Sequence, residues 1–293
     1  MDLNKINRIK KFALIALFSD DELMQILVLK GGNALDLVYQ IDGRSSLDLD
    51  FSIEILLTEE DEKRIGGKIE KVLIATFKEN GFRAFDIHFF PRPPKVTPDM
   101  ESFWGGYRVE FKVIEIEKFE SLAGDLESAR RQAQVFTPKQ EKIFYVDISK
   151  FEYCKKKQPR QFDGYTIYVY TPEMIVFEKV RAICQQMLEY AEIVKNPTRS
   201  SRARDFYDIY LVLENFKIDL GSTENLDLLK CIFQAKRVPL IFIGKIPDYR
   251  EYHRADFVAV RDTVKPSVKL REYDFYFDYV IEKLDVLKTL WIE

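Results

Sequence analysis

The sequence predicts an α/β (α+β) protein. A mixed sheet with flanking helices is expected over residues 1–170, and a mainly helical domain over residues 171–293. Before residue 170, short runs of β-branched and aromatic residues alternate with segments whose apolar residues recur at helical spacing. At Thr171-Pro172-Glu173 a capping threonine precedes a proline at the first helical position, and helical periodicity dominates after it. We therefore place a domain boundary near residue 170.

Composition indicates a globular protein. The 293 residues are 46% hydrophobic and 14% aromatic, enough to build a core for one large or two modest domains. The 45 basic and 48 acidic residues nearly cancel, so any polyanion site has to be a local patch. No apolar run has transmembrane length and charges interrupt the N-terminal apolar steps, so we expect a cytoplasmic protein with no membrane partner. Three widely spaced cysteines outside any C-x-x-C motif are expected to be buried thiols.

The first half reads as helices packed on strands. Residues 4–18 carry a helical apolar stripe, and Ser19-Asp20-Asp21-Glu22 is expected to begin a short second helix. Thr58 is the expected N-cap of a helix over residues 59–79, which Asn80-Gly81 ends. The other predicted elements of this half are strands over residues 26–29, 47–54, 83–90, 107–115, 142–149 and 165–170, helices over 33–39 and 121–136, and loops over 91–98 and 154–160.

The second half reads as helices throughout. One stripe of apolar residues predicts a helix from Pro172 to about Lys195, which Asn196-Pro197 ends. Ser200 or Ser201 is the expected cap of the next helix. Further helices are predicted over residues 224–235, around Phe257, and over 274–290.

A glycine turn follows the first predicted strand. In Lys30-Gly31-Gly32-Asn33 the two glycines allow the backbone to turn sharply and to approach a ligand before the helix over residues 33–39. The unpaired N–H groups and the dipole of a helix N-terminus favour an anion. This turn therefore predicts a phosphate site, in which the Asn33 amide can donate a hydrogen bond to a phosphate oxygen.

Two aspartates share one face of the next strand. From Leu47 to Glu54 apolar and polar residues alternate, so Asp48 and Asp50 project to the same side. Side chains two residues apart on a strand lie roughly 7 Å apart, and their carboxylates can converge on one or two divalent cations. Magnesium is the expected ion. The alternative is a half-solvated strand with ordinary surface aspartates, but aspartate is a poor strand former.

Together these motifs resemble the signature of the nucleotidyltransferase superfamily and, more narrowly, the AbiEii/AbiGii toxin family of nucleotidyltransferases. The resemblance runs from about residue 26 to about residue 215. One departure is that many relatives have Gly-Ser where this chain has Gly32-Asn33. The matching residues are Lys30 to Asn33, Arg44-Ser45-Ser46 before the aspartate pair, Glu178-Lys179, and Arg204-Asp205-Phe206-Tyr207-Asp208.

The resemblance implies a nucleotidyltransferase-type sheet and a metal-dependent enzyme. It would use Mg²⁺ or Mn²⁺ to move a nucleoside monophosphate from a nucleoside triphosphate to a hydroxyl of RNA, such as the tRNA 3′ end, or of a protein. It would be the toxin of a toxin–antitoxin system, with a separately encoded antitoxin as partner. Two alternatives stay open: phosphoryl transfer to a protein, and a catalytically silent subunit that binds a partner.

The resemblance also suggests roles for individual residues. Asp48 and Asp50 would hold the metal with a third carboxylate, for which Asp147 is preferred over Glu110, although either could simply face solvent. Lys179 would contact the triphosphate, with the alternative of a surface lysine. Asp205 or Asp208 would orient Lys179 or the acceptor, with the alternative of an Arg204–Asp208 ion pair within one helix. The nucleotide-binding set would be Lys30, Gly31, Gly32, Asn33, Arg44, Ser46 and Lys179.

Basic residues could also contact an RNA acceptor. Lys155 to Lys157 with Arg160, and Arg199 with Arg202, are candidates for binding its backbone. Charged loops are more often simply solvated, so this role is the weaker reading of these residues.

Overall fold

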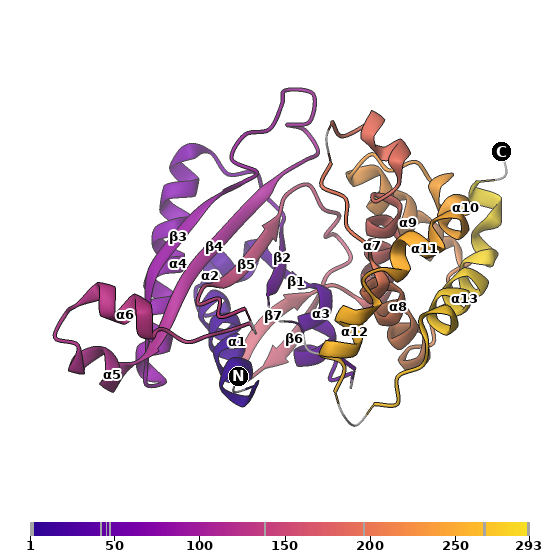
Figure 1. The fold of residues 1–293 in the computed structure, drawn as a ribbon. Coiled ribbons are helices and arrows are strands. Elements are labelled where there is room, and N and C mark those ends of the chain that lie inside the picture. Colours follow the sequence, from indigo (N-terminus) through magenta and orange to yellow (C-terminus); the bar gives the residue numbers. More distant parts are fainter. Residues whose placement is uncertain are drawn as a thin grey trace. The chain divides into compact units, whose positions relative to one another are not determined.

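The computed structural model describes residues 3–41, 43–44, 46, 48–137, 139–195, 197–265 and 268–291. The chain forms two compact units (Figure 1). The predicted domain boundary near residue 170 stays a prediction, because short earlier segments belong to the second unit. Unit 1 comprises Met1–Asn33, Leu47–Lys150 and Gln158–Val169, and unit 2 comprises Ala34–Ser46, Phe151–Lys157 and Tyr170–Glu293.

Unit 1 is built on a mixed sheet. Among the described residues it has seven strands in the order β3-β4-β5-β2-β1-β7-β6 (Figure 1). The β2–β5 and β1–β7 pairs are parallel, and the other neighbours are antiparallel. The predicted mixed sheet is thus confirmed. Its strands are β1 (Leu27–Lys30), β2 (Leu49–Ile53), β3 (Phe82–Arg92), β4 (Gly106–Glu115), β5 (Phe144–Ser149), β6 (Gln158–Phe162) and β7 (Tyr165–Val169).

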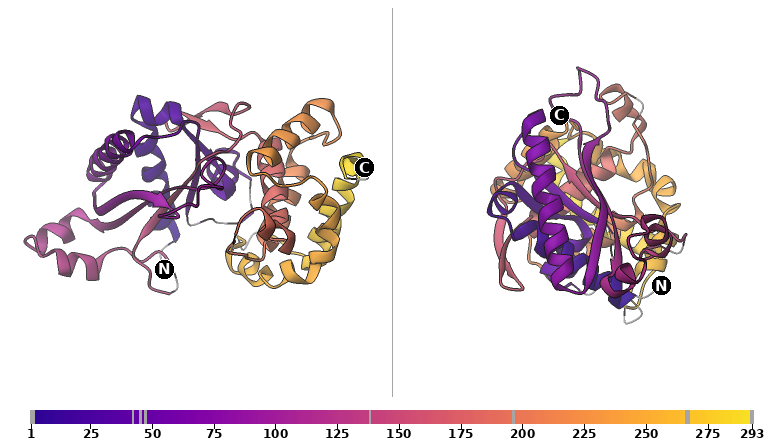
Figure 2. Two further views of the ribbon diagram at one scale, coloured as in Figure 1. Left: turned by 90° about the horizontal axis from the view of Figure 1, so that it is seen from above. Right: turned by 90° about the vertical axis from the view of Figure 1, so that its left-hand side faces the viewer.

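Two long helices bury the apolar side of this sheet. Helix α1 (Leu3–Phe18) packs on α4 (Glu59–Glu79), and α4 runs alongside β3 (Figure 2). Phe77 of α4 contacts Phe12 of α1 and Phe111 of β4 edge to face, with ring centroids 6.1 and 5.6 Å apart. Helix α4 has the predicted ends, because Thr58 and Asp61 form a reciprocal capping box at its start. The remaining helices of this unit are α2 (Asp21–Ile26), α3 (Gly31–Asn33), α5 (Ile116–Ser121) and α6 (Leu126–Gln132).

Three expectations for this unit were wrong. The helix predicted over residues 121–136 is replaced by α5 and α6, because Ala123 and Gly124 adopt positive φ between them. The loop predicted from residue 91 begins later, because strand β3 continues to Arg92 and includes Pro91. An edge strand tolerates proline because its outer side has no neighbouring strand that needs an N–H donor. The end of the predicted basic loop over residues 154–160 belongs to strand β6, which pairs with β7. The two strands are joined at Asp163-Gly164, where both residues have positive φ, as is typical of type I′ hairpin turns.

Unit 2 is mainly helical, as predicted. Its core is aromatic: Phe206 of α8 stacks on Phe277 of α13 with centroids 4.9 Å apart. No helix in the described ranges is long and apolar enough to span a membrane. Its elements are the π-helix η1 (Ala34–Val38), α7 (Pro172–Cys184), η2 (Leu188–Glu192), α8 (Ala203–Asn215), α9 (Thr223–Ala235), α10 (Phe242–Lys245), η3 (Ile246–Tyr249), α11 (Arg250–Arg254), α12 (Phe257–Thr263), α13 (Tyr273–Leu284) and η4 (Asp285–Leu290).

Two helix ends in unit 2 differ from the predicted ones, and long-range hydrogen bonds lie at both. Helix α7 ends at Cys184, eleven residues before the predicted end, and Gln186 instead accepts hydrogen bonds from Arg199 and Ser200. The predicted cap of α8 by Ser200 or Ser201 was wrong as well. The helix begins after Arg202, whose N–H donates to Nδ1 of His253 at 3.1 Å. Cys154 and Cys184 are buried thiols as expected, whereas Cys231 is half-buried.

Candidate functional site

The glycine turn brings the backbone against Asp50. Strand β1 ends at the buried Lys30, and Gly31 follows with φ +69°. A Cβ on Gly31 would lie 2.8 Å from Oδ2 of Asp50, so a side chain here would collide with that carboxylate. Helix α3 begins at Gly31, two residues before the start predicted for this helix, and η1 follows it directly.

Asn33 holds the backbone of Asp48. Its side chain is fully buried, its Nδ2 donates to the carbonyl of Asp48 at 2.6 Å, and its Oδ1 accepts from Nζ of Lys10 at 3.3 Å. The amide thus makes two hydrogen bonds inside the protein, and the phosphate contact predicted for it stays a prediction. Lys10 was not singled out from the sequence, because a lysine on an amphipathic helix carries no signal that it is buried.

The sheet register places a third carboxylate beside the aspartate pair. Asp48 is exposed just before β2, and Asp50 is half-buried on β2. Across the strands Lys30 is opposite Asp50, Asp50 opposite Asp147, and Asp147 opposite Arg108. Directly opposed residues share a face, so Asp147 lies next to Asp50 on the polar face. We call Lys30, Asp50, Asp147 and Arg108 the charged row.

Glu110, the other candidate for a third carboxylate, is one step away from the charged row. It is opposite Tyr145 on β5, two residues before Asp147. The register therefore favours Asp147 over Glu110 as the neighbour of Asp50.

Arg108 binds Asp147 with both arms of its guanidinium. Its Nε and Nη2 donate to Oδ1 and Oδ2 of Asp147, each at 2.7 Å. The guanidinium also lies over the ring of Tyr145, 4.6 Å from its centroid, and Nη1 of Arg92 is 3.6 Å from the same carboxylate. Sequence reasoning did not name Arg108, although its alternation with Val109 and the apolar residues of β4 marked it as part of a polar face.

The aspartate pair suits a divalent cation. Asp50 lies on β2 and the exposed Asp48 just before it, and carboxylate oxygens are the ligands that Mg²⁺ prefers. Among the described residues, three or more acidic, histidine or cysteine side chains do not gather at a metal-binding spacing. Asp147 is bound to Arg108 instead, so its role as a metal ligand stays a prediction.

The predicted residues of unit 2 form a buried ion network. Nζ of Lys179 in α7 donates to Asp205 at 2.9 Å and to Asp208 at 2.7 Å, both in α8. Nε and Nη2 of Arg44 bind the two oxygens of Asp208 at 2.8 and 2.6 Å. The side chains of all four residues are at most 10% exposed. Lys179 is therefore not a surface lysine, and both predicted aspartates hold it.

Opposite charges keep this network ionised despite its burial. Burial by itself lowers the pKa of Lys179, but Asp205 and Asp208 raise that pKa above its ordinary value. Burial by itself raises the pKa of Asp205, but Lys179 and Arg202 lower it to about 2. Arg44 and Lys179 likewise hold the pKa of Asp208 below its usual range, against the effect of its burial. We call Lys179, Asp205, Asp208 and Arg44 the buried network.

The alternative reading, an Arg204–Asp208 ion pair within α8, was wrong. Arg204 pairs with Asp256 at 3.3 Å, because Arg44 already occupies Asp208. Ser46 is half-buried, and Ser45 lies outside the described residues. The nucleotide contacts predicted for Arg44 and Ser46 stay predictions.

The basic candidates for RNA binding already have protein partners in part. Lys156 pairs with Glu224 at 2.6 Å, and the Arg199 guanidinium lies 4.7 Å from the ring centroid of Tyr252. Their contact with RNA stays a prediction.

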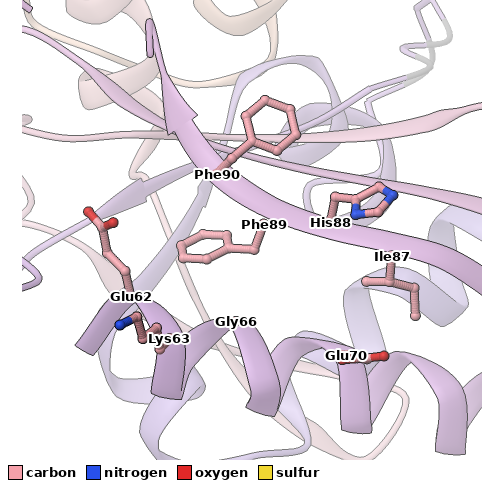
Figure 3. Close-up of a pocket in the computed structure, with 8 residues that line it drawn as sticks. All are labelled: Glu62, Lys63, Gly66, Glu70, Ile87, His88, Phe89 and Phe90. Atoms are coloured by element: carbon pink, nitrogen blue, oxygen red, sulfur yellow. The ribbon is translucent and has the colours of Figure 1, made fainter. Parts of the chain in front are cut away.

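A cavity of about 470 Å³ lies elsewhere in unit 1, between α4 and β3 (Figure 3). Phe89 points toward α4, and the carboxylate of Glu62 stands above it (Figure 3). The predicted site residues do not line this cavity, but Phe90 in its lining is directly opposite Arg108 of the charged row. It is lined by Glu62, Lys63, Gly66, Glu70, Ile87, His88, Phe89 and Phe90.

The motif geometry agrees with a family match. The model of the family described as "Nucleotidyl transferase AbiEii toxin, Type IV TA system" matches residues 13–281. The chain belongs to this family. It is accordingly a nucleotidyltransferase of the AbiEii toxin family, and the expected family and enzyme class are confirmed. No curated protein matches the chain.

Solved structures show a similar fold. JHP933 from Helicobacter pylori superposes with a TM-score of 0.51 at 17% identity, covering 98% of this chain and 92% of that one. At this identity the likeness concerns the fold alone. An antigenic nucleotidyltransferase-like protein from Paracoccidioides brasiliensis matches with a TM-score of 0.35 at 12% identity, covering 80% of this chain and 91% of that one.

Proposed function

We propose that this AbiEii-family protein is a metal-dependent enzyme that moves a nucleoside monophosphate from a nucleoside triphosphate to a hydroxyl of RNA or of a protein. The observation that carries the proposal is the glycine turn itself: Gly31 packs against the half-buried Asp50 of β2, and the exposed Asp48 lies two residues before Asp50. Two aspartates behind a glycine turn offer a cation site next to backbone N–H groups that suit phosphate.

In this proposal the chain supplies binding and orientation. Backbone N–H groups at Gly31 and Gly32 receive phosphate oxygens, and Asn33 keeps the backbone of Asp48 in place through its 2.6 Å hydrogen bond. Mg²⁺ or Mn²⁺ bound by Asp48 and Asp50 would supply positive charge that stabilises the phosphates and acidifies the attacking hydroxyl. Lys179 adds a positive charge whose position Asp205 and Asp208 set.

The proposed reaction is a displacement at the α-phosphorus. The acceptor oxygen forms a bond to the α-phosphorus, the bond from that phosphorus to the bridging oxygen of the β-phosphate breaks, and pyrophosphate leaves. The hydroxyl proton is released from the acceptor oxygen. The family's place in type IV toxin–antitoxin systems supports a separately encoded antitoxin as partner, and a cytoplasmic location would give access to triphosphates.

Labelled triphosphates test the proposal. Purified protein is incubated with Mg²⁺, total cellular RNA or cell protein, and triphosphate labelled at either the α or the γ phosphorus. We expect label in the acceptor from the α position only, and none with Asp50→Asn. The exposed Asp227→Asn on α9 is the matched control and should label as the wild type does. Label transferred from the γ position would instead establish phosphoryl transfer, and no label from either would favour a subunit that only binds a partner.

A further inference from the structure

In the charged row, the candidate third carboxylate of the cation site, Asp147, is bound by Arg108. Asp147 is opposite Asp50 on one side and Arg108 on the other. The side chain of Asp147 is 34% exposed. Both of its oxygens accept hydrogen bonds from Arg108, each at 2.7 Å. The guanidinium takes one acceptor position on each oxygen and places a positive charge beside the carboxylate, which disfavours a second cation there.

Arg108 is held in place more firmly than an ordinary surface arginine. It lies on β4, which has a neighbouring strand on each side, its side chain is 18% exposed, and its guanidinium stacks on Tyr145. Arg92, in contrast, is 50% exposed and approaches Asp147 only at 3.6 Å. Removing Asp147 from Arg108 would leave a partly buried guanidinium without its bidentate partner, which is costly.

The charges in the charged row indicate what the Arg108–Asp147 pair does. Asp50 and Asp147 are directly opposite each other on β2 and β5, and like charges in this arrangement destabilise a sheet. Arg108 neutralises Asp147. The pair that remains next to the turn consists of Asp48 and Asp50.

We propose that Arg108 is a positioning residue that acts as a built-in counter-ion for Asp147, so that Asp48 and Asp50 bind the divalent cation without a third carboxylate. This inference rests on the proposed function, since it concerns the same cation. It assigns Arg108 a role in setting cation affinity, and it takes Asp147 out of the set of metal ligands expected from the sequence.

A double-mutant cycle with Mn²⁺ as probe tests the inference. Mn²⁺ binding to the full chain is measured by calorimetry without nucleotide. We expect Asp48→Asn and Asp50→Asn to abolish binding and Asp147→Asn to change the affinity by less than about twofold. Arg108→Gln should tighten binding by about fivefold or more, because it releases a neighbouring carboxylate to the ion. Adding Asp147→Asn to Arg108→Gln should remove that gain.

The matched control is Arg130→Gln. Arg130 binds both oxygens of Asp86 at 2.8 and 3.0 Å in the same unit, so this variant breaks a similar pair away from the charged row. It should leave Mn²⁺ affinity unchanged. The thermal midpoint in EDTA provides a readout without metal: Arg108→Gln should lower it, and the added Asp147→Asn should restore part of the loss.

The outcomes separate this inference from the proposed function. If Asp147→Asn alone weakens Mn²⁺ binding by more than about fivefold, or Arg108→Gln brings no gain, the counter-ion role is wrong while metal dependence stands. If the wild type does not bind Mn²⁺ with or without triphosphate, the metal-dependent function and the inference both fail. If the EDTA midpoints of Arg108→Gln and the double variant are equal, Arg108 does not act through Asp147.

Discussion

The charged row of unit 1 and the buried network of unit 2 use the same residue types in opposite ways. Both combine aspartates with lysine and arginine. In the charged row Asp50 is half-buried on β2, and Asp48, just before that strand, is exposed. In the buried network, the side chains of Lys179 and Asp208 are at most 6% exposed and bind each other at 2.7 Å. Exposed carboxylates can exchange water for a cation, whereas buried ones are committed to partners inside the protein.

This difference separates ligand binding from positioning. Substitution of the exposed Asp48 beside the charged row should change chemistry or cation affinity with little effect on folding, because solvent can take over from a lost exposed group. A substitution in the buried network should cost stability first, because it leaves an uncompensated buried charge. The experiments below test that division, from the largest expected effect to the smallest.

The largest effect is expected for Asp48→Asn. At saturating triphosphate, turnover should fall by about a thousandfold or more, because charge stabilisation of the transition state is lost. The thermal midpoint should hardly change, because the side chain is exposed. Single-turnover kinetics and thermal denaturation on the same preparation measure both quantities, with Asp227→Asn as control. Wild-type turnover in Asp48→Asn would remove this residue from the site.

Lys179→Met should destabilise the fold. The variant leaves Asp205 and Asp208 buried with one cation fewer, which should lower the free energy of unfolding by about 3–5 kcal/mol. Urea denaturation measures the loss, and adding Asp205→Asn should recover part of it. The control is Lys230→Met, at a side chain that is 51% exposed. A cost of Lys179→Met as small as that of Lys230→Met would contradict the division between the two regions.

The stability of unit 2 should depend on pH in part through His253. Burial lowers the pKa of His253 to about 4 from its ordinary value of 6.5. Between these pH values the unfolded chain binds a proton that the folded chain does not, so stability rises with pH across this window, by about 3 kcal/mol. His253→Gln can still accept from Arg202 and should flatten this slope. The stability that Asp205 adds is present above pH 3.8 and is lost toward about 2, so it lies in a separate window.

The smallest of these effects is expected for Asn33→Ser, which replaces the amide with a shorter hydroxyl side chain. Serine is too short to keep both hydrogen bonds of the amide, so the free energy of unfolding should fall by about 1–2 kcal/mol. Because the backbone of Asp48 loses its anchor, Mn²⁺ affinity should weaken as well. Asn215→Ser, on the exposed end of α8, serves as control. Unchanged Mn²⁺ affinity in Asn33→Ser would show that Asn33 does not position Asp48.

Local signals were enough to predict much of the fold. The capping box at Thr58 and the Asn80-Gly81 end predicted α4 within its observed bounds, because capping depends on residues a few positions apart. The alternating pattern likewise predicted the strand that carries Asp50, although β2 begins one residue after Asp48. The end of α7 and the start of α8 escaped this reasoning. They depend on Gln186 and His253, which reach these positions from 13 to 51 residues away.

The sequence by itself determined the family, the sheet followed by helices, and the two motifs of the candidate site, because each depends on short-range spacing. Only the tertiary structure decided which side chains meet. The parallel pairing of β2 with β5 brings Asp147 beside Asp50, the antiparallel pairing of β4 with β5 brings Arg108 to Asp147, and Arg44 reaches Asp208 from 164 positions away. A strand's own residues define its two faces, but its neighbour and its register are set by packing of the whole sheet.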